Sequence, residues 1–275
     1  MQSTQNYQYT TENNSVFTIH AVTMLGDREE QQDCYGYELL EKEGLAVLCD
    51  GMGGHQGGSL ASTLAVSQML GDYINWTLVD QSEDGFAPIH LRASAQKAND
   101  DILSLKNSQG EALNAGSTLT AVYIRDNRFY WCSTGDTRGY LYRRNEMVQF
   151  TVDHNYGTVL LEQKTAGVID DVFYDRNSKK SEALVSYLGV GNKPLFDENE
   201  LPVSLLKGDI ICLCTDGLYR LLSDEAIKRI LQDTSCLEDA LRIMQDEADR
   251  GSKALSVRRD NMSVILIKIQ EGTIR

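Results

Sequence analysis

The 275-residue sequence predicts an α+β fold in which strands and helices occupy separate stretches of the chain. Apolar, β-rich runs lie in pairs around short turns, as in antiparallel sheets. Two long helical patterns follow the first strand pair, and neither an internal repeat nor a low-complexity linker interrupts the chain. We therefore expect a single domain over residues 16–270, preceded by a flexible lead-in over residues 1–15.

The first half of the chain predicts strands over 16–24, 34–40 and 45–49, followed by two helices. The first helix is expected over 58–77, with apolar residues at helical spacing at Leu60, Leu64, Met69 and Ile74. The second is expected over 88–106, with an inner face of Leu91, Ala95, Ala98 and Ile102.

The second half predicts an antiparallel meander with strands over 119–125, 128–134, 139–143 and 147–151. The charged segment at about 155–186 is expected to form a short helix and an exposed flap. A buried strand over 210–214 and a central strand over 262–269 complete the sheets. Between them, Ser223 begins one helix, and Ser235 with Glu238 predicts a capping box for a second, whose inner face is Leu237, Leu241, Met244 and Ala248.

Charge and composition exclude several classes of function. A net charge of −14 would repel a nucleic acid. No apolar run approaches the roughly 18 residues of a membrane helix, and the polar N-terminus lacks the pattern of a signal peptide, so we expect a cytoplasmic protein. Without a C-x-x-C pair or clustered histidines, a zinc site is not expected. Four of the six cysteines lie in apolar strand-like runs, where core packing is their expected role.

Acidic residues recur where predicted strands meet loops. Asp50 follows the apolar run 45–49 and opens a glycine-rich loop, Asp216 follows the strand over 210–214, and Asp260 precedes the strand over 262–269. Asp136 occupies an expected hairpin turn, and Asp33 lies just before a strand. Each alone is an ordinary turn residue, but together they require cations. Oxygen ligands without histidine or thiolate favour Mg²⁺ or Mn²⁺.

A binuclear site of this kind activates a bound water for in-line attack on a phosphate ester. Arg28 would bind the phosphate with its bidentate guanidinium. These residues belong to a series of motifs whose order resembles that of the metal-dependent protein phosphatase family (PPM, phosphatase 2C), over about residues 15–270. The motifs are Arg28 with Asp33, Asp50-Gly51-Met52-Gly53-Gly54-His55, Gly116-Ser117-Thr118, Gly135-Asp136-Thr137-Arg138, Thr151-Val152-Asp153-His154, Thr215-Asp216-Gly217-Leu218 and Asp260-Asn261.

The resemblance implies a four-layer α/β/β/α sandwich of two antiparallel sheets and the removal of phosphate from phosphoserine and phosphothreonine. Asp50 would bridge two ions, with the Gly51 carbonyl, Asp216 and Asp260 as further ligands and Asp33 holding water of the second ion. Asp136 matches an aspartate that helps to hold a third ion in many bacterial members. Stand-alone bacterial members also imply a partner serine/threonine kinase whose phosphorylated targets are the substrates.

The sequence departs from the family pattern at two positions. Met52 stands where eukaryotic members have a histidine proposed as general acid, so protonation of the leaving group would fall to a metal-bound water or to His55. Gln32 replaces a frequent glutamate before Asp33, in the outer shell of the second ion. Because every carboxylate ligand is kept, we expect an active enzyme.

Two other functions are considered. Cys132 and Arg138 have the C-x5-R spacing of cysteine-dependent phosphatases, although Cys132 lies in a strand-like run. A module of the same fold could also bind phosphoproteins without turning them over. Cys49 and Cys214 adjoin expected ligands and could make activity redox-sensitive, while His154 after Asp153 is expected to be structural.

Overall fold

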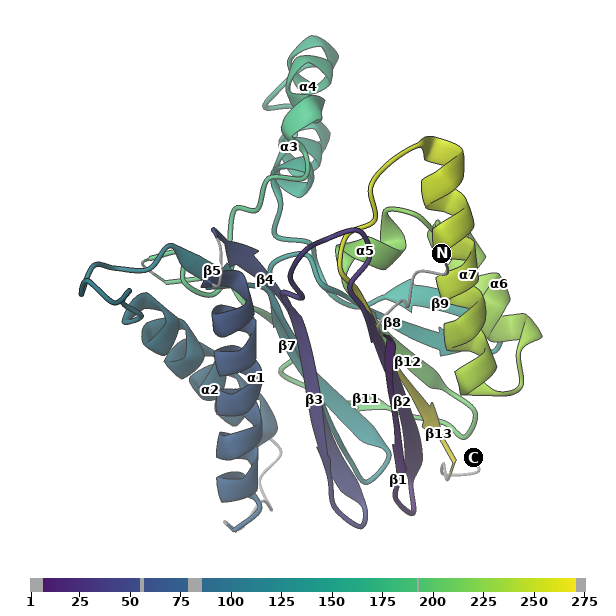
Figure 1. The fold of residues 1–275 in the computed structure, drawn as a ribbon. Coiled ribbons are helices and arrows are strands. Elements are labelled where there is room, and N and C mark those ends of the chain that lie inside the picture. Colours follow the sequence, from purple (N-terminus) through teal and green to yellow (C-terminus); the bar gives the residue numbers. More distant parts are fainter. Residues whose placement is uncertain (1–6, 55–56, 79–85, 192, 271–275) are drawn as a thin grey trace.

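In the computed structural model, residues 7–54, 57–78, 86–191 and 193–270 are described, and they form two antiparallel sheets packed face to face (Figure 1). The first sheet has the order β1-β2-β13-β12-β8-β9. Its strands are β1 (Tyr7–Asn13), β2 (Phe17–Met24), β8 (Arg138–Arg143), β9 (Glu146–Gln149), β12 (Ile210–Cys214) and β13 (Met262–Ile269).

The second sheet has the order β10-β7-β6-β4-β3, with β11 also paired to β7 and β5 to β4. Its strands are β3 (Asp33–Leu39), β4 (Glu43–Gly53), β5 (Ala115–Ser117), β6 (Leu119–Arg125), β7 (Arg128–Thr134), β10 (Asp197–Glu198) and β11 (Val203–Ser204).

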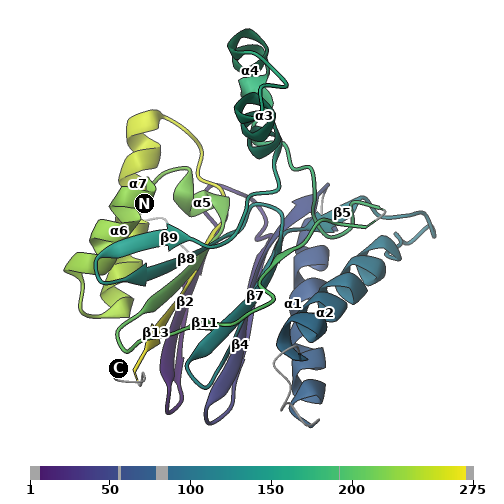
Figure 2. The ribbon, with the colours of Figure 1, turned by 180° about the vertical axis from the view of Figure 1, so that it is seen from behind.

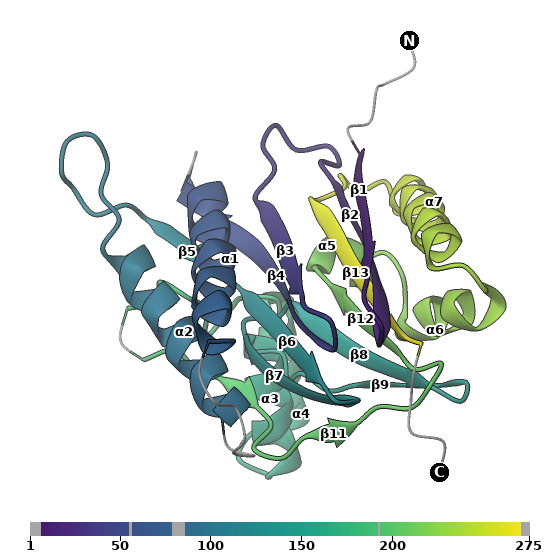
Figure 3. The ribbon, with the colours of Figure 1, turned by 90° about the horizontal axis from the view of Figure 1, so that it is seen from below.

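A helical layer covers the outer face of each sheet (Figures 2 and 3). The helices α1 (Gly57–Trp76) and α2 (Phe86–Leu103) pack on the second sheet, and α6 (Asp224–Asp233) and α7 (Leu237–Leu255) pack on the first. A third apolar core, which includes Phe17, Leu48, Phe129 and Ile265, fills the space between the sheets. This arrangement confirms the α+β class and the α/β/β/α sandwich.

The apolar patterns place most elements correctly. β13, whose residues are buried on both faces, lies between β2 and β12 as expected of a central strand. The expected inner faces of α2 and α7 are buried. In α1, however, Leu60 and Ile74 are exposed, because the helix contacts the sheet through small residues such as Ala61 and Ala65. No helix among the described residues has the length and apolar character needed to cross a membrane.

The expected flap is a pair of helices that projects from the sandwich. It consists of α3 (Tyr156–Thr165), α4 (Asp171–Asn177) and a 3-10 turn at Ser178–Lys180. Figure 1 shows the pair above the edge of the sandwich where β4 ends and where α5 (Asp216–Tyr219) lies. Leu160 is the buried residue of α3, and α4 has none, so the flap is attached mainly through its base.

The expectation of a flexible lead-in over residues 1–15 is wrong for Tyr7–Asn13, which forms β1; residues 1–6 lie outside the described part of the chain. β1 pairs with β2 along its whole length at the edge of the first sheet. From Gln8 to Asn13 its side chains are polar or tyrosine and most are exposed. The strand therefore depends on backbone pairing with β2 rather than on an apolar stripe that the sequence would reveal.

The expected four-stranded meander is also wrong, because its two hairpins belong to different sheets. β6 pairs with β7 in the second sheet, and β8 pairs with β9 in the first. Asp136 therefore lies in a crossover between the sheets instead of a hairpin turn. Gly135 makes the crossover possible: its φ is +93°, and a Cβ there would lie 2.6 Å from the Thr118 side chain.

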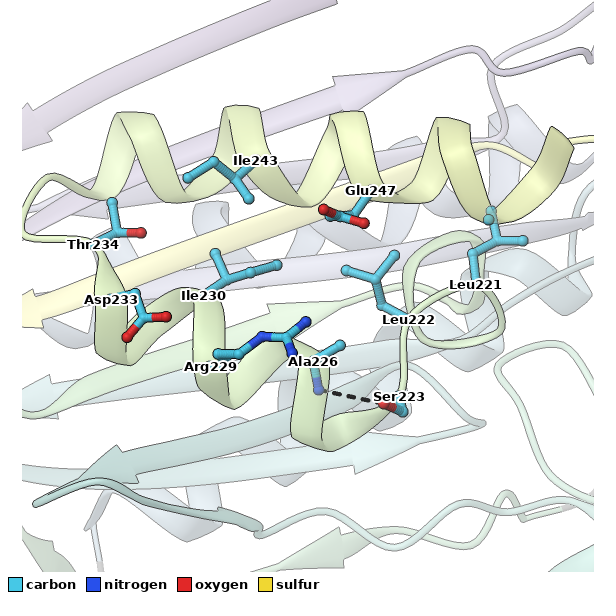
Figure 4. A pocket seen from close by; sticks show the side chains of 11 residues that line it. Leu221, Leu222, Ser223, Ala226, Arg229, Ile230, Asp233, Thr234, Ile243 and Glu247 are labelled. Carbon is cyan, nitrogen blue, oxygen red and sulfur yellow. Dashed lines mark hydrogen bonds between the residues drawn. The ribbon is translucent and has the colours of Figure 1, made fainter. Parts of the chain in front are cut away.

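Helix capping agrees with the sequence at α6 and differs at α7. The Ser223 hydroxyl accepts a hydrogen bond from the Ala226 amide at 3.3 Å, at one end of a groove between the two helices (Figure 4). The predicted box of Ser235 and Glu238 does not form, since Cys236 is the N-cap and makes no side-chain cap bond. Glu238 instead pairs with Arg242 one turn along the helix.

Candidate metal centre

Strand pairing in the second sheet brings the first two carboxylates together. Asp33, the first residue of β3, is directly opposite Asp50 on β4. Directly opposed residues of antiparallel strands have Cβ atoms about 5 Å apart. The two acids that sequence analysis predicts as ligands are therefore cross-strand neighbours.

The backbone around Asp50 is held by the neighbouring segment β5–β6. The Asp50 amide donates to Thr118 Oγ1 at 2.8 Å, and the Thr118 amide donates to the Asp50 carbonyl at 2.8 Å. Gly51 then passes close to the start of α1, where a Cβ would lie 2.1 Å from the Gly58 carbonyl oxygen. Only glycine fits this approach, which fixes the position of the Gly51 peptide.

The first sheet supplies Asp216 and Asp260. Asp216 begins α5 directly after β12, and Asp260 lies in the loop before β13. Because β12 and β13 are antiparallel neighbours, the end of one and the start of the other lie at the same edge of the sheet. Gly217 and Asn261 touch there so closely that a Cβ on Gly217 would lie 2.0 Å from the Asn261 carbonyl oxygen.

Two hydrogen bonds join the sheets at this edge. Thr215 Oγ1 donates to Asp33 Oδ2 at 2.9 Å, and the Gln32 amide donates to Asn261 Oδ1 at 2.8 Å. They align the carboxylates of one sheet with those of the other. The resulting metal cleft has a volume of about 370 Å³, and its lining includes Arg28, Asp50, Gly51, Asp136, Asp216 and Asp260.

Asp33 is not part of the cleft lining, but it lies directly opposite the lining residue Asp50 and has one unsatisfied oxygen. Its side chain is buried, and Oδ1 has no hydrogen-bond partner among the described residues. Burial raises the pKa of the Asp33 carboxyl to about 7, and the charges of Asp216 and Asp260 add to the increase. An unpartnered carboxylate oxygen beside other acids is a fitting neighbour for a hydrated cation.

The other acids are also held in an environment that disfavours their charge. Burial, followed by the charge of Asp33, raises the pKa of Asp50 well above its ordinary value. Burial raises the pKa of Asp216 to about 6, although Arg220 opposes the shift. Burial likewise raises the pKa of Asp136. These carboxylates would be stabilised in their ionised form by divalent cations, so the residues present fit the expected metal site.

Two arginines interact with the carboxylates. Arg28 Nη2 forms an ion pair with Asp260 Oδ2, and Arg220 Nη2 lies 2.9 Å from Asp216 Oδ2. Among the described residues, no group of three or more acidic, histidine or cysteine side chains stands close enough together to hold a metal ion in this structure. Arg28 is half-exposed at the rim of the cleft, where a substrate phosphate can reach it.

The profile of the protein phosphatase 2C family matches residues 25–255. The chain belongs to the protein phosphatase 2C family. The serine/threonine phosphatase stp of Listeria innocua is 26% identical over 242 residues, which cover 88% of this chain and 91% of that protein. The crystal structure of PstP/Ppp from Mycobacterium tuberculosis has a TM-score of 0.74 at 25% identity and covers 93% of this chain and 100% of its own. A structure of the PstP catalytic domain with two manganese ions has a TM-score of 0.68 at 25% identity and covers 97% of this chain and 99% of its own.

Within this phosphatase 2C fold, the cysteine-dependent alternative is wrong. Cys132 is fully buried in β7, between its β-sheet partners Ala121 and Glu198, and burial raises the pKa of its thiol far above the usual range. Arg138 is committed to Asp153, with Nη2 2.8 Å from Oδ2, and its guanidinium lies over the ring of Tyr219. A thiolate nucleophile requires the opposite environment.

Other predicted residues have structural positions. Cys49 and Cys214 are fully buried, in agreement with core packing. The His154 ring accepts a hydrogen bond from the Gly135 amide at 3.3 Å, while its own amide donates to the Gly135 carbonyl at 2.8 Å. It thereby supports the crossover that carries Asp136, a structural role as expected. Met52 lines the metal cleft, and His55 lies outside the described residues.

The roles of three residues in this phosphatase 2C cleft were not predicted from the sequence, although Thr118 belongs to one of the motifs. Arg220 pairs with Asp216, Glu182 approaches it from the flap, and Thr118 holds Asp50. The pairing of Arg220 with Asp216 could have been predicted, because the two residues are four apart, which is the spacing of ion pairs on a helix. The contact with Glu182 depends on the folded position of the flap and has no local indication.

Proposed function

We propose that this chain is a metal-dependent phosphatase of phosphoserine and phosphothreonine in proteins. The observation that carries the proposal is the convergence of carboxylates from both sheets on one cleft, beside a buried Asp33 oxygen that has no partner. Membership of the protein phosphatase 2C family supports it, as does the similarity to the serine/threonine phosphatases stp and PstP.

We assign Asp50, the Gly51 carbonyl, Asp216 and Asp260 to two ions, with Asp33 holding water of the second. Mn²⁺ or Mg²⁺ bound there would supply an activated water and neutralise the charge of an in-line displacement. The chain's own contribution is to hold the oxygen ligands rigidly through Thr118, Thr215 and Asn261.

Arg28 is assigned to the substrate phosphate. In the structure its guanidinium pairs with Asp260. Engagement of Asp260 with a cation would release the guanidinium toward an incoming phosphate, which it can bind with two hydrogen bonds. Met52 has no proton to donate to the leaving group, so a cleft water or His55 is assigned this step.

The proposed substrates are phosphorylated proteins, the targets of a serine/threonine kinase. The cleft is open to solvent, and its lining includes Glu182 and Leu184 after the flap helices, as access for a protein segment requires. We place the catalytic domain over residues 16–270, with β1 as an added edge strand, and we propose a cytoplasmic location.

Hydrolysis of p-nitrophenyl phosphate tests the proposal. We would compare the wild type, Asp216→Asn and Cys132→Ala, with the exposed α7 change Asp246→Asn as a matched control, each with Mn²⁺ and with chelator. Chelator and Asp216→Asn should each reduce the rate on the order of 100-fold or more, while Cys132→Ala and Asp246→Asn stay active. Activity that survives chelation but not Cys132→Ala would overturn the metal mechanism. Phosphopeptide binding by an inactive, folded wild type would favour the binding module.

A further inference from the structure

Arg220 holds a position that connects the metal cleft to the flap. It follows α5 directly, one helical turn beyond Asp216, and its amide donates to the Asp216 carbonyl at 3.0 Å. Its guanidinium lies 2.9 Å from Asp216 Oδ2 through Nη2 and 3.5 Å from Glu182 Oε2 through Nη1. One cation thus bridges a ligand carboxylate and an acid at the base of the flap.

A third carboxylate shares the same space. Asp136, Glu182 and Arg220 all line the metal cleft, and all three also line an adjoining flap pocket of about 360 Å³. Among the described residues, Arg220 is the cation whose side chain lines both spaces. Arg138, the other cation of the flap pocket, is already bound to Asp153.

Three acids around one space need compensating positive charge. A guanidinium tethered one helical turn from Asp216 supplies that charge without recruiting a free ion. A divalent ion between Asp136 and Asp216 would have to lie against this guanidinium or displace it. Displacement would break its pairs with both Asp216 and Glu182, whereas the more exposed Arg28 has a single carboxylate partner to leave. Removal of the Arg220 charge would leave Asp136, Asp216 and Glu182 facing a space suited to a hard cation.

We propose that the Arg220 guanidinium takes the place of a third metal ion on the Asp136 side of the cleft, so that this chain binds two divalent ions. Arg220 is then a positioning residue that acts through Asp216 and Glu182. The inference rests on the proposed function, and it replaces the expectation that Asp136 helps to hold a third ion.

The test is the number of Mn²⁺ ions bound, measured by titration calorimetry and by metal analysis after equilibrium dialysis. We would compare the wild type with Arg220→Met, Arg220→Gln and the double variant Arg220→Met/Asp136→Asn. Arg242→Met is a matched control, because Arg242 makes an i,i+4 pair with Glu238 at the same distance of 2.9 Å on the exposed face of α7. The wild type and control should bind two ions, both single Arg220 variants three, and the double variant two.

A third ion in the wild type, or two ions in both Arg220 variants, would overturn the inference. Manganese-dependent hydrolysis by the wild type would leave the proposed function standing in that case. A folded wild type that binds no Mn²⁺ and hydrolyses nothing would overturn both. Two substitutions of Arg220 are included so that a folding defect in one does not decide the result.

Discussion

Asp33 is the residue of the proposed metal site whose surroundings are the most unusual. It is buried, one of its oxygens accepts from Thr215, and the other has no partner among the described residues. Without a cation, ionisation of this carboxyl opposes folding, because its pKa in the folded protein is about 7. The metal-free protein therefore binds a proton at Asp33 that the unfolded chain releases at lower pH.

The sign of this effect sets a pH dependence for the metal-free protein. A raised carboxyl pKa gives stability that is lost as pH rises through about 7. In chelator, the wild type should lose unfolding free energy on the order of 1 kcal/mol between pH 6 and 8 relative to Asp33→Asn. Urea unfolding of both proteins at both pH values measures this difference. His20 and His154, whose pKa values are lowered by burial, titrate in both proteins and cancel. If the wild type and Asp33→Asn differ in unfolding free energy by the same amount at pH 6 and pH 8, the raised pKa of Asp33 is contradicted.

Gly51 lies near the end of β4 and Gly54 directly follows the strand, and the two should respond differently to alanine. A Cβ at Gly51 would meet the Gly58 carbonyl oxygen at 2.1 Å, whereas a Cβ at Gly54 meets nothing within 4 Å. Gly51→Ala should lower the unfolding free energy by at least about 2 kcal/mol, and Gly54→Ala should change it little. Urea unfolding in chelator separates this packing effect from metal binding. Equal losses of unfolding free energy in the two variants would contradict the difference in packing between Gly51 and Gly54.

Residues of the site were predictable where a local pattern marks them. Asp50, Asp216 and Asp260 adjoin apolar strands, so their sequence context already places them at sheet edges. Arg220 and Glu182 were not predictable in the same way, since their significance comes from a contact between α5 and the flap. Periodicity and turn chemistry carry no information on such contacts.

At the level of elements, strands were easier to predict than their partners. The runs that form β6 to β9 have the right positions, but the sequence did not reveal that Gly135 sends the chain from one sheet to the other. β1 was missed because a polar edge strand lacks the alternating apolar pattern. In both cases the hydrogen bonding between strands in the folded protein, and not the local sequence, determines which strands form and which sheet they join.

The two helix starts on the first sheet provide a matched test of capping. Ser223 accepts from the Ala226 amide, whereas the Ser235 side chain does not cap α7. Ser223→Ala should therefore lower the unfolding free energy by about 1 kcal/mol, and Ser235→Ala should lower it by much less. Chemical denaturation of both variants measures the two losses. A loss at Ser235 as large as that at Ser223 would contradict the observed start of α7.

At the scale of the whole molecule, the site exists only where the sheets meet. Asp33 and Asp50 come from the second sheet, and Asp216 and Asp260 come from the first. The hydrogen bonds from Thr215 to Asp33 and from Gln32 to Asn261 hold the two sheets together where these carboxylates lie. The sequence resemblance predicted the four layers correctly, because the order of motifs along the chain reflects the order of strands that carry them.

In the proposed mechanism, carboxylates from both sheets bind ions that the phosphatase requires. The most direct measurement is phosphate release from a phosphothreonine peptide by one protein preparation, first with Mn²⁺, then after chelator, and then after Mn²⁺ is restored. We expect phosphate release with Mn²⁺, a fall in its rate on the order of 100-fold or more in chelator, and recovery of the rate when Mn²⁺ is restored. Release that continues at the same rate in chelator, while the protein stays folded, would contradict the proposed mechanism.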